Sequence, residues 1–417
     1  MRNKKPSLGL AAVLAIFAIA TLTTASPATA QTEKVLYNFF PDSSLAFRPS
    51  SGVIFDKSGN LYGVTSSGGV NGMGTVYELS PTASGGWTAK VLHTFGQGTD
   101  GQIPVGNLIM DSAGNLYGTT TYGGTGTCAT TPVGCGTVFE LIPGAGGVWT
   151  EKRLHSFKGT DGNYPQSGVI IDASGNLYGT TQNGGAFGST FTGGTAFELK
   201  LKAGTWGASV LHSFGSAGDG QFPFAGLTLD ASGNLYGTTG SGGAVGSGIV
   251  FELVHGSSGW TENILYSFTD GGEPFGNLIF DGSGNIYGTT AFGGPYGAGS
   301  AFELMPAGGG TYTESTLFNF QQNGFDGSET HGAVVMGASG NLYGTAEFGG
   351  IGGGGVVYEL TPAGGGTWNE VVLRNFSEKE RGFLPQWNLI LDSSGNLYGT
   401  TADGGLQGGG TVFELTP

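Results

Sequence analysis

The sequence predicts an all-β chain that folds as a seven-bladed β-propeller with four antiparallel strands in each blade. Gly accounts for 85 of the 417 residues, aromatic residues for 12% and charged residues for only 11%. Long helices are disfavoured, because each Gly inside a helix costs about 1 kcal/mol relative to Ala. The hexapeptide Ser-Gly-Asn-Leu-Tyr-Gly and its variants recur seven times, and each copy is accompanied by strand-like segments. These two observations together indicate a repeat fold built from short strands and tight turns.

The repeat unit is about 55 residues long. Spacings between successive copies lie between 51 and 61 residues, a period that is typical of propellers and solenoids. Within the fourth copy, the expected strands cover residues 226–229, 235–239, 249–253 and 260–268. Four short antiparallel strands per unit are the blade of a propeller.

The two ends of the repeat array predict how the ring closes. The third-strand motif Val-Phe-Glu-Leu occurs for the last time at residues 412–415, and no fourth strand follows it. The missing strand is found at the other end, where residues 33–39 match the fourth strand of the other copies. We therefore expect the N-terminal strand to pair with the C-terminal blade, which removes two free sheet edges. A solenoid would need capping repeats instead, and none is visible.

Residues 1–30 have the pattern of a secretory signal peptide. Three basic residues precede an apolar run over residues 8–22, and a small-residue Ala-Thr-Ala motif ends at Ala30. Cleavage is expected between Ala30 and Gln31, since the apolar run is short for an uncleaved anchor. We expect residues 31–417 to form a single propeller domain, secreted or periplasmic, monomeric and without a membrane span.

The charge of the chain limits its binding partners, and its two cysteines predict a disulfide. The formal net charge is −15, and it becomes −18 without the first thirty residues, which hold three basic and no acidic residues. Such an acidic chain repels phosphate backbones, so nucleic-acid binding is not expected. The two cysteines, Cys128 and Cys135, lie in one loop, and in an oxidising compartment they are expected to form a disulfide.

The repeated motifs resemble those of a known family. Most copies carry Leu-His-Ser-Phe, Asp-Gly and Pro, then Asp-x-Ser-Gly-Asn-Leu-Tyr-Gly-Thr-Thr, Gly-Gly and Gly-Thr-Val-Phe-Glu-Leu. In these residues the chain resembles the GloVer (Gloeo_Verruco) tandem repeat of exported bacterial proteins named for their choice of surface anchor. The resemblance covers essentially the whole mature chain and implies export and a propeller fold, but no catalytic residues. Because no C-terminal anchor is visible, we expect release rather than surface display.

Two acidic positions recur with the repeat. An Asp begins the first turn in six copies, and in the sixth copy Gly337 replaces it. Such an Asp accepts hydrogen bonds from backbone N–H groups two residues on, so we interpret it as a brace of the turn. A Glu in the third strand occurs in all seven copies and is expected to accept hydrogen bonds from neighbouring strands or from the backbone. No cofactor or metal is predicted; calcium in the Asp-rich loops is the alternative, although one carboxylate per turn supplies too few oxygens.

Three histidines share one position in the fourth strand, namely His93, His155 and His212. Other copies fill the position with Tyr, Phe or Arg, which indicates packing. Because the three histidines belong to different blades, they are not expected to meet at one metal ion.

The loops between blades supply the predicted ligand-binding residues. Each of five loops carries an Asp-Gly pair, and the acidic residues are Asp100, Asp161, Asp219, Asp270 and Asp326. In a propeller these loops emerge on one face, around the mouth of the central channel. A partial ring of Asp there would suit a cation or a polyol, and ordinary turn chemistry is the alternative.

Departures from the repeat supply the catalytic candidates, because catalysis needs unlike groups in unlike roles. They cluster in copies six, seven and one, which are adjacent in a closed ring. In the sixth inter-blade loop, His331 is taken to occupy the place of the usual Pro. The full set of candidates is Asp326, Glu329, His331, Glu347, Arg381, Asp403 and Arg48. Carboxylates, a His and two Arg on one face would suit acid–base chemistry on an anionic sugar or a lactone.

The sequence supports two functional hypotheses, which belong to different classes of protein. The first is an exported, non-catalytic binding or scaffold module that engages a polysaccharide or a cell-surface protein through the loop-rich face. The near-identity of the copies favours it, since an enzyme would differentiate its blades more. The alternative is a secreted polysaccharide hydrolase or lyase, or a lactonase, with its site in the propeller mouth. No Ser/His/Asp set, phosphate-cradling loop or metal-ligand spacing supports this alternative.

Overall fold

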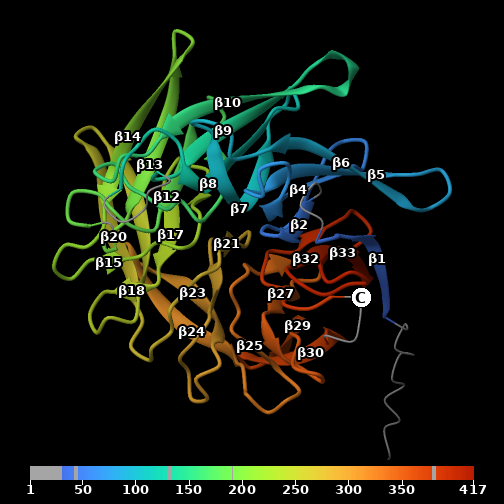
Figure 1. Ribbon diagram of the computed structural model, residues 1–417. Coiled ribbons are helices and arrows are strands. Elements are labelled where there is room, and N and C mark those ends of the chain that lie inside the picture. Colours follow the sequence, from blue (N-terminus) through green and yellow to red (C-terminus); the bar gives the residue numbers. More distant parts are fainter. Residues whose placement is uncertain (1–30, 42–45, 129–133, 190, 378–381) are drawn as a thin grey trace, which may run out of the picture.

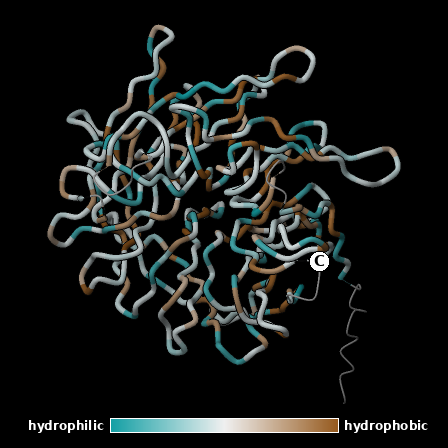
Figure 2. The backbone as a smooth tube through the Cα atoms, viewed as in Figure 1, coloured by the Kyte–Doolittle hydropathy of each residue, from teal (hydrophilic) through white to brown (hydrophobic). Residues whose placement is uncertain are grey.

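Seven four-stranded antiparallel sheets surround a central axis in the computed structural model of the protein, which confirms the predicted seven-bladed propeller (Figure 1). The structure describes residues 31–41, 46–128, 134–189, 191–377 and 382–417. The expected signal peptide therefore lies outside the described residues. In these ranges no helix is long and apolar enough to cross a membrane. Hydrophobic stretches recur in every blade around the ring (Figure 2).

The first four blades, each from its innermost strand outward, have the following strands. Blade 1 contains β3 (Ile54–Phe55), β4 (Leu61–Gly68), β5 (Thr75–Pro81) and β6 (Trp87–Thr94), with β2 (Ala46–Pro49) paired to β4. Blade 2 contains β7 (Gly101–Met110), β8 (Leu116–Gly123), β9 (Thr137–Pro143) and β10 (Trp149–Ser156), with the short 3-10 helix η1 (Ala145–Gly147) between the last two. Blade 3 contains β11 (Ile170–Ile171), β12 (Leu177–Thr181), β13 (Thr195–Lys202) and β14 (Thr205–Ser213). Blade 4 contains β16 (Thr228–Leu229), β17 (Leu235–Thr239), β19 (Ile249–Gly256) and β20 (Gly259–Ser267).

The remaining three blades repeat this order. Blade 5 contains β21 (Ile279–Phe280), β22 (Ile286–Thr290), β23 (Ser300–Gly308) and β24 (Thr311–Asn319). Blade 6 contains β26 (Val335–Met336), β27 (Leu342–Ala346), β29 (Val356–Gly364) and β30 (Thr367–Asn375). Blade 7 contains β31 (Ile390–Leu391), β32 (Leu397–Thr401), β33 (Thr411–Thr416) and β1 (Thr32–Asn38). Two small ribbons, β15 (Gly220–Gln221) with β18 (Ser241–Gly242) and β25 (Gly327–Ser328) with β28 (Phe348–Gly349), join inter-blade loops to the loops between second and third strands.

The ring closes as the ends of the sequence predict. Strand β1 pairs antiparallel with β33 from Thr32 opposite Thr416 to Asn38 opposite Thr411, and the two strands lie side by side in Figure 1. A second link joins blade 7 to blade 1, where the Thr400 hydroxyl donates to the Ser51 carbonyl at 2.7 Å. The N-terminal strand therefore completes the last blade, so that this blade is made from both ends of the described chain.

The core lies between neighbouring blades, where one pair of aromatic rings recurs at every interface. The Phe that follows each outer strand packs against the aromatic residue in the third strand of the next blade, with ring centroids 4.9 to 5.3 Å apart. Phe95 and Phe139 are one such pair, and both are fully buried. The Gly of the Leu-Tyr-Gly motif makes room for the ring, since a Cβ at Gly118 would lie 2.6 Å from Phe139 Cζ. The repeated Gly is therefore fixed by packing of the third strand and not by its own backbone angles.

In every blade except blade 6, the first turn is held by one carboxylate, as the sequence predicts. In blade 3, Asp172 Oδ1 accepts hydrogen bonds from the backbone N–H groups of Ser174 and Asn176, at 2.8 and 2.9 Å. Its Oδ2 accepts from the Asn176 amide at 2.8 Å and from the Tyr178 hydroxyl at 3.1 Å. Burial opposes ionisation of Asp172, but these hydrogen bonds outweigh burial and hold its pKa below the usual range. In blade 2, Tyr117 links the turn to the third-strand Glu140 at 3.1 Å, which confirms the predicted role of that Glu.

We expect Asp172→Ala to lower the free energy of unfolding by about 1–3 kcal/mol, because four donors lose their shared acceptor. Urea denaturation measures this difference. Blade 6 shows how the Asp is replaced in nature, since Gly337 stands there and the Asn341 amide donates to Glu359 instead, at 2.6 Å. Ser174→Ala is the matched control, because only the backbone of Ser174 takes part in the Asp172 contacts, and it should change stability by less than about 0.5 kcal/mol. Equal stability of the two variants would refute the role of Asp172 in stabilising the turn.

Candidate functional site at the mouth of the central channel

The loops that lead into each innermost strand share one backbone form, which corrects the placement of His331. Each loop has a non-Gly residue with positive φ, such as Glu273 at 43° and Glu329 at 59°. The residue after it is Pro274 in the fifth loop and Thr330 in the sixth. Thr330 therefore takes the place of the usual Pro, and the prediction that His331 does so was wrong by one residue. The shift matters because the next position in the loop faces the channel mouth.

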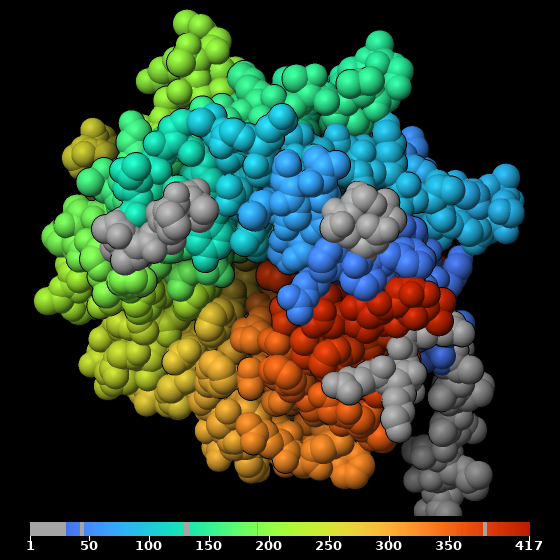
Figure 3. Space-filling model, in the orientation of Figure 1, coloured from blue at the N-terminus to red at the C-terminus, as the bar shows by residue number. Residues whose placement is uncertain are grey.

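That next position brings unlike side chains to one side of the mouth. In blades 3 to 6 it is occupied by Gln166, Phe224, Phe275 and His331. With Glu347, Gln386 and Trp387, these four side chains line a cavity of about 240 Å³. A second cavity of about 240 Å³ shares five of these residues and continues inward along the first strands. Figure 3 shows this face of the molecule hollowed near the centre of the ring.

The polar end of the mouth is organised around Glu347, which follows β27. Its Oε2 lies 2.7 Å from Nδ1 of His331, and its Oε1 accepts a hydrogen bond from the Gln386 amide at 2.6 Å. The side chains of Glu347 and His331 are 13% and 26% exposed, so the pair is accessible from the cavity but screened from bulk water. The carboxylate of Glu329 belongs to the same group, whose donor atoms all lie within 4.8 Å of one another. Blade 6 thus supplies a hydrogen-bonding cluster of two carboxylates and one imidazole.

The apolar end of the mouth is a short aromatic stack. The rings of Phe224 and Phe275 lie with centroids 4.4 Å apart and an interplanar angle of 28°. Phe275 in turn meets His331 edge to face at 5.0 Å, which connects the stack to the polar cluster. On the other side, the indole N–H of Trp387 donates to the Pro49 carbonyl at 3.2 Å, which fixes the indole in the cavity wall. An aromatic surface therefore ends in hydrogen-bonding groups within one cavity.

Further in, three asparagines cross the blade boundaries of the channel. Asn107 Oδ1 accepts from the Gly52 N–H at 2.9 Å, Asn277 does the same for Gly226 at 2.9 Å, and Asn388 for Ala333 at 2.7 Å. All three asparagines line both the second cavity and a third one, of about 300 Å³, deeper in the channel. They form the waist of the channel. Their amide groups add polar character to a channel whose other walls are mainly apolar.

The aromatic and Asn residues were missed by sequence reasoning, although a signal for them existed. The catalytic candidates among the departures from the repeat were all charged residues or His. Trp387 occupies a position that holds Ser, Gly or Ala in the other six copies, and Asn alternates with Gly or Ala at the waist. The position of Phe224 and Phe275 varies among Ser, Val, Gln, His and Phe. A column-by-column comparison of the seven loops would have singled out Trp387 and the asparagines.

The five inter-blade Asp residues lie elsewhere, at the outer part of the blade interfaces. Asp100, Asp161 and Asp219 accept from His93, His155 and His212, respectively, at 3.0, 3.0 and 3.1 Å. Asp270 accepts from the Gly294 N–H at 2.9 Å. The residues that line the mouth and channel cavities include none of the five. Each of the three His rings also packs edge to face on the Phe two residues on, in keeping with the predicted packing role.

Asp326 has a buried carboxylate as its neighbour. Burial, and then the charge of Asp326, raise the pKa of Glu370 to about 8. Glu370 lies on the outer strand β30, and one of its carboxylate oxygens is buried without a hydrogen-bond partner in the described structure. The same strand position holds Glu151 and Glu314, whose pKa values burial also raises. Acidic pairs at the outer blade interfaces therefore form a feature separate from the mouth.

None of the other catalytic candidates that the structure describes lies in the mouth cluster. Arg48 pairs with Asp403 through Nε at 3.2 Å, with 58% of the Arg48 side chain exposed, and neither residue lines the mouth cavity. Arg381 lies outside the described residues. Of the predicted set, the structure thus brings together Glu329, His331 and Glu347.

In the loop of blade 2, Cys128 and Cys135 are joined by a disulfide.

Comparison with known proteins gives a family and a fold. The family model described as the Gloeobacter/Verrucomicrobia repeat matches residues 18–189, 125–324 and 281–417. The extracellular domain of BT4673 from B. thetaiotaomicron is similar with a TM-score of 0.53 and 10% identity, over 89% of this chain and 39% of that chain. A protein from Lactobacillus plantarum is similar with a TM-score of 0.50 and 14% identity, over 82% of this chain and 88% of that chain. Identities this low show the fold alone. No curated protein matches the chain.

Proposed function

The chain belongs to the Gloeobacter/Verrucomicrobia repeat family, and from this premise we propose that it is an exported, non-catalytic binding module with a carbohydrate ligand at the mouth of its channel. Export rests on the basic, apolar and small-residue pattern of residues 1–30. The observation that carries the ligand class is the aromatic stack of Phe224 and Phe275, which ends at the His331–Glu347 pair.

The mouth has the chemistry that a sugar ring requires. A pyranose offers a face of C–H groups, which packs on an aromatic ring, and a rim of hydroxyls, which both donate and accept hydrogen bonds. Glu347 and Gln386 offer acceptor and donor atoms beside the Phe275 ring. A few fixed polar groups in an otherwise apolar cavity are the usual composition of a small-molecule site.

Size and charge narrow the ligand further. A cavity of about 240 Å³ lies slightly below the roughly 300–1,000 Å³ typical of small-molecule pockets, so it suits one or two sugar rings better than a long chain segment. Two carboxylates at the mouth and a net charge of −15 for the whole sequence oppose an anionic ligand. We therefore propose a neutral saccharide, such as the end of a polysaccharide chain.

Calorimetric titration of residues 31–417 with a panel of neutral oligosaccharides tests this proposal. We expect saturable binding to one class, and a loss of about tenfold to hundredfold in affinity on Phe275→Ala, because the stacking surface is removed. Phe187→Ala is the matched control, since Phe187 is 62% exposed on a loop and lines none of the cavities at the mouth. Equal affinity of the two variants, or no binding by any neutral sugar, would reject a carbohydrate site at the mouth.

One observation favours a second candidate, the secreted hydrolase, lyase or lactonase. The 2.7 Å contact between Glu347 and Nδ1 of His331 orients the imidazole, as in a carboxylate–histidine pair that acts as a general base. Product release from the sugars that bind would support this candidate, and His331→Gln should then abolish turnover while binding is retained. Binding without turnover supports the non-catalytic module.

A further inference from the structure

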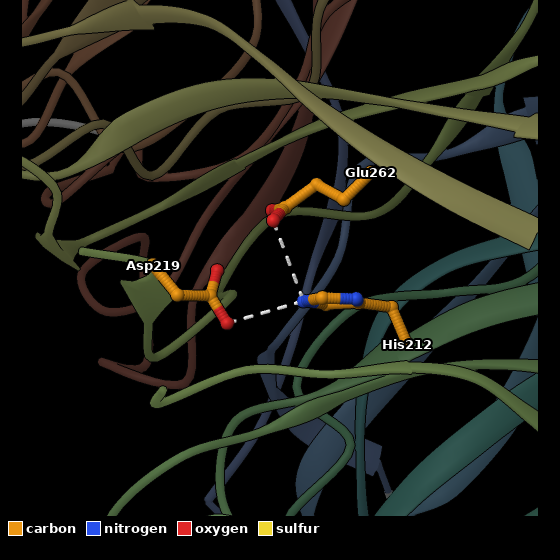
Figure 4. A group of neighbouring side chains, drawn as sticks. All are labelled: His212, Asp219 and Glu262. Atoms are coloured by element: carbon orange, nitrogen blue, oxygen red, sulfur yellow. Dashed lines mark hydrogen bonds and ion pairs between the residues drawn. The ribbon is translucent and has the colours of Figure 1, made fainter. Parts of the chain in front are cut away.

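A mixed group of metal-ligating side chains lies between blades 3 and 4, away from the mouth. His212 from β14, Asp219 from the inter-blade loop and Glu262 from β20 point toward one another in Figure 4. His212 Nε2 lies 3.1 Å from Asp219 Oδ2 and 3.6 Å from Glu262 Oε2. One donor atom from each residue falls within a group in which all separations are below 4.8 Å.

The backbone holds each of these residues in place. His212 follows a register shift between β13 and β14, where Ala196 and Phe197 pair with His212 and Val210. Asp219 is fixed by the N–H of Gly220 at 2.6 Å and the N–H of Gly215 at 3.2 Å. Its side chain is only 4% exposed. The group is therefore preorganised by strands and a braced loop.

The charges of the group are not balanced by the described side chains. Two carboxylates face one imidazole, and the side chain of Glu262 is only 13% exposed. Its Oε1 is buried with no hydrogen-bond partner among the described residues. Burial of a carboxylate oxygen without a partner is costly unless a cation or a donor completes it.

We propose that His212, Asp219 and Glu262 bind one divalent transition-metal ion of the zinc class between blades 3 and 4. Imidazole nitrogen with carboxylate oxygen is a donor set that zinc and its neighbours accept in tetrahedral sites, with water as the fourth ligand. Calcium and magnesium prefer sites made of oxygen alone. The ion ties the outer strand of blade 3 to that of blade 4. The three histidines of the fourth strands remain apart, as the sequence predicts, and the other ligands come from the loop and the next blade.

The neighbouring interface supplies an internal comparison. Between blades 2 and 3, His155 and Asp161 form the same pair at 3.0 Å. The strand position of Glu262, opposite Leu253, is filled there by Ala208, opposite Leu199. That interface keeps two ligands and lacks the third, so it should bind the ion far more weakly.

Titration of metal-free residues 31–417 with Co²⁺ tests the proposal, because the visible absorption of Co²⁺ reports its coordination. Elemental analysis after loading with Zn²⁺ gives the stoichiometry. We expect one ion per chain, and affinity reduced by at least about tenfold in both Glu262→Ala, which copies Ala208, and His212→Tyr, which copies Tyr266. Glu262→Gln serves as a second variant that keeps the side-chain shape. His155→Tyr is the matched control and should leave affinity unchanged.

The histidine at the mouth requires a separate control variant, since Glu329, His331 and Glu347 also form a group of donor atoms. His331→Ala should retain the Co²⁺ spectrum if the ion binds between the blades. No binding by the wild-type protein, loss of the ion in His331→Ala, or unchanged affinity in Glu262→Ala and Glu262→Gln would each overturn the assignment.

Discussion

Deletion of residues 31–39 is expected to lower the free energy of unfolding by at least about 5 kcal/mol. The segment contains β1 and two buried side chains, Leu36 and Phe39, which are 7% and 1% exposed. Phe39 packs on Tyr77 of blade 1 with ring centroids 5.0 Å apart. Removal of a buried Leu or Phe side chain costs about 2–5 kcal/mol each, and the unpaired edge of β33 adds a risk of aggregation. The loss approaches the entire stability of many domains.

Urea denaturation of the truncated and full proteins, combined with a peptide of residues 31–41 added in trans, measures this effect. The peptide should restore the original denaturation midpoint, because it re-forms the fourth strand of blade 7 by strand addition. A peptide of scrambled sequence should not. Phe39→Ala alone should cost about 3–5 kcal/mol, and the exposed Phe187→Ala less than about 0.5 kcal/mol. An unchanged midpoint after the deletion would mean that the pairing of β1 with β33 does not stabilise the ring.

Stability is expected to fall as the pH rises from about 4.5 to 8, and Glu370 is the largest identified cause. The pKa of its carboxyl is raised from 4.5 to about 8 by burial and by the charge of Asp326. Within this window the folded protein holds the proton and the unfolded chain has released it. The folded state therefore loses about 1.4 kcal/mol per pH unit relative to the unfolded state, until the penalty is complete above pH 8.

Glu370→Gln should accordingly stabilise the protein at pH 8 by up to about 4 kcal/mol and have little effect at pH 4.5. Thermal unfolding across this range measures the change in slope. A residual slope of the same sign is expected from Glu151 and Glu314, whose pKa values are also raised by burial. Asp326→Asn tests the contribution of the Asp326 charge to the raised pKa of Glu370, and it should shift the fall in stability toward lower pH. Parallel pH curves for the wild type and Glu370→Gln would contradict the assignment.

Much of the candidate site was missed by sequence reasoning. His331, Glu329 and Glu347 were singled out because they break the repeat, and the structure does place them together. Asp326 comes from the same loop as His331 but lies beside Glu370 of the outer strand β30 and not at the mouth, because the loop runs from an outer strand to the channel. Arg48 and Asp403 lie close together although 355 residues separate them, since the ring closes between them.

The repeat pattern was enough to predict the number of blades, the order of strands, the braced turns and the strand that closes the ring. These features follow from local hydrogen bonding and from a repeat that must bury its edges. Which side chains face one another across blades could be seen only in the folded ring. These contacts are the aromatic stack at the mouth, the asparagine waist of the channel, and the group of His212, Asp219 and Glu262. The physical reason is that such contacts join residues about one repeat apart, and their distances depend on the angle between two packed sheets, which no pattern along a single strand records.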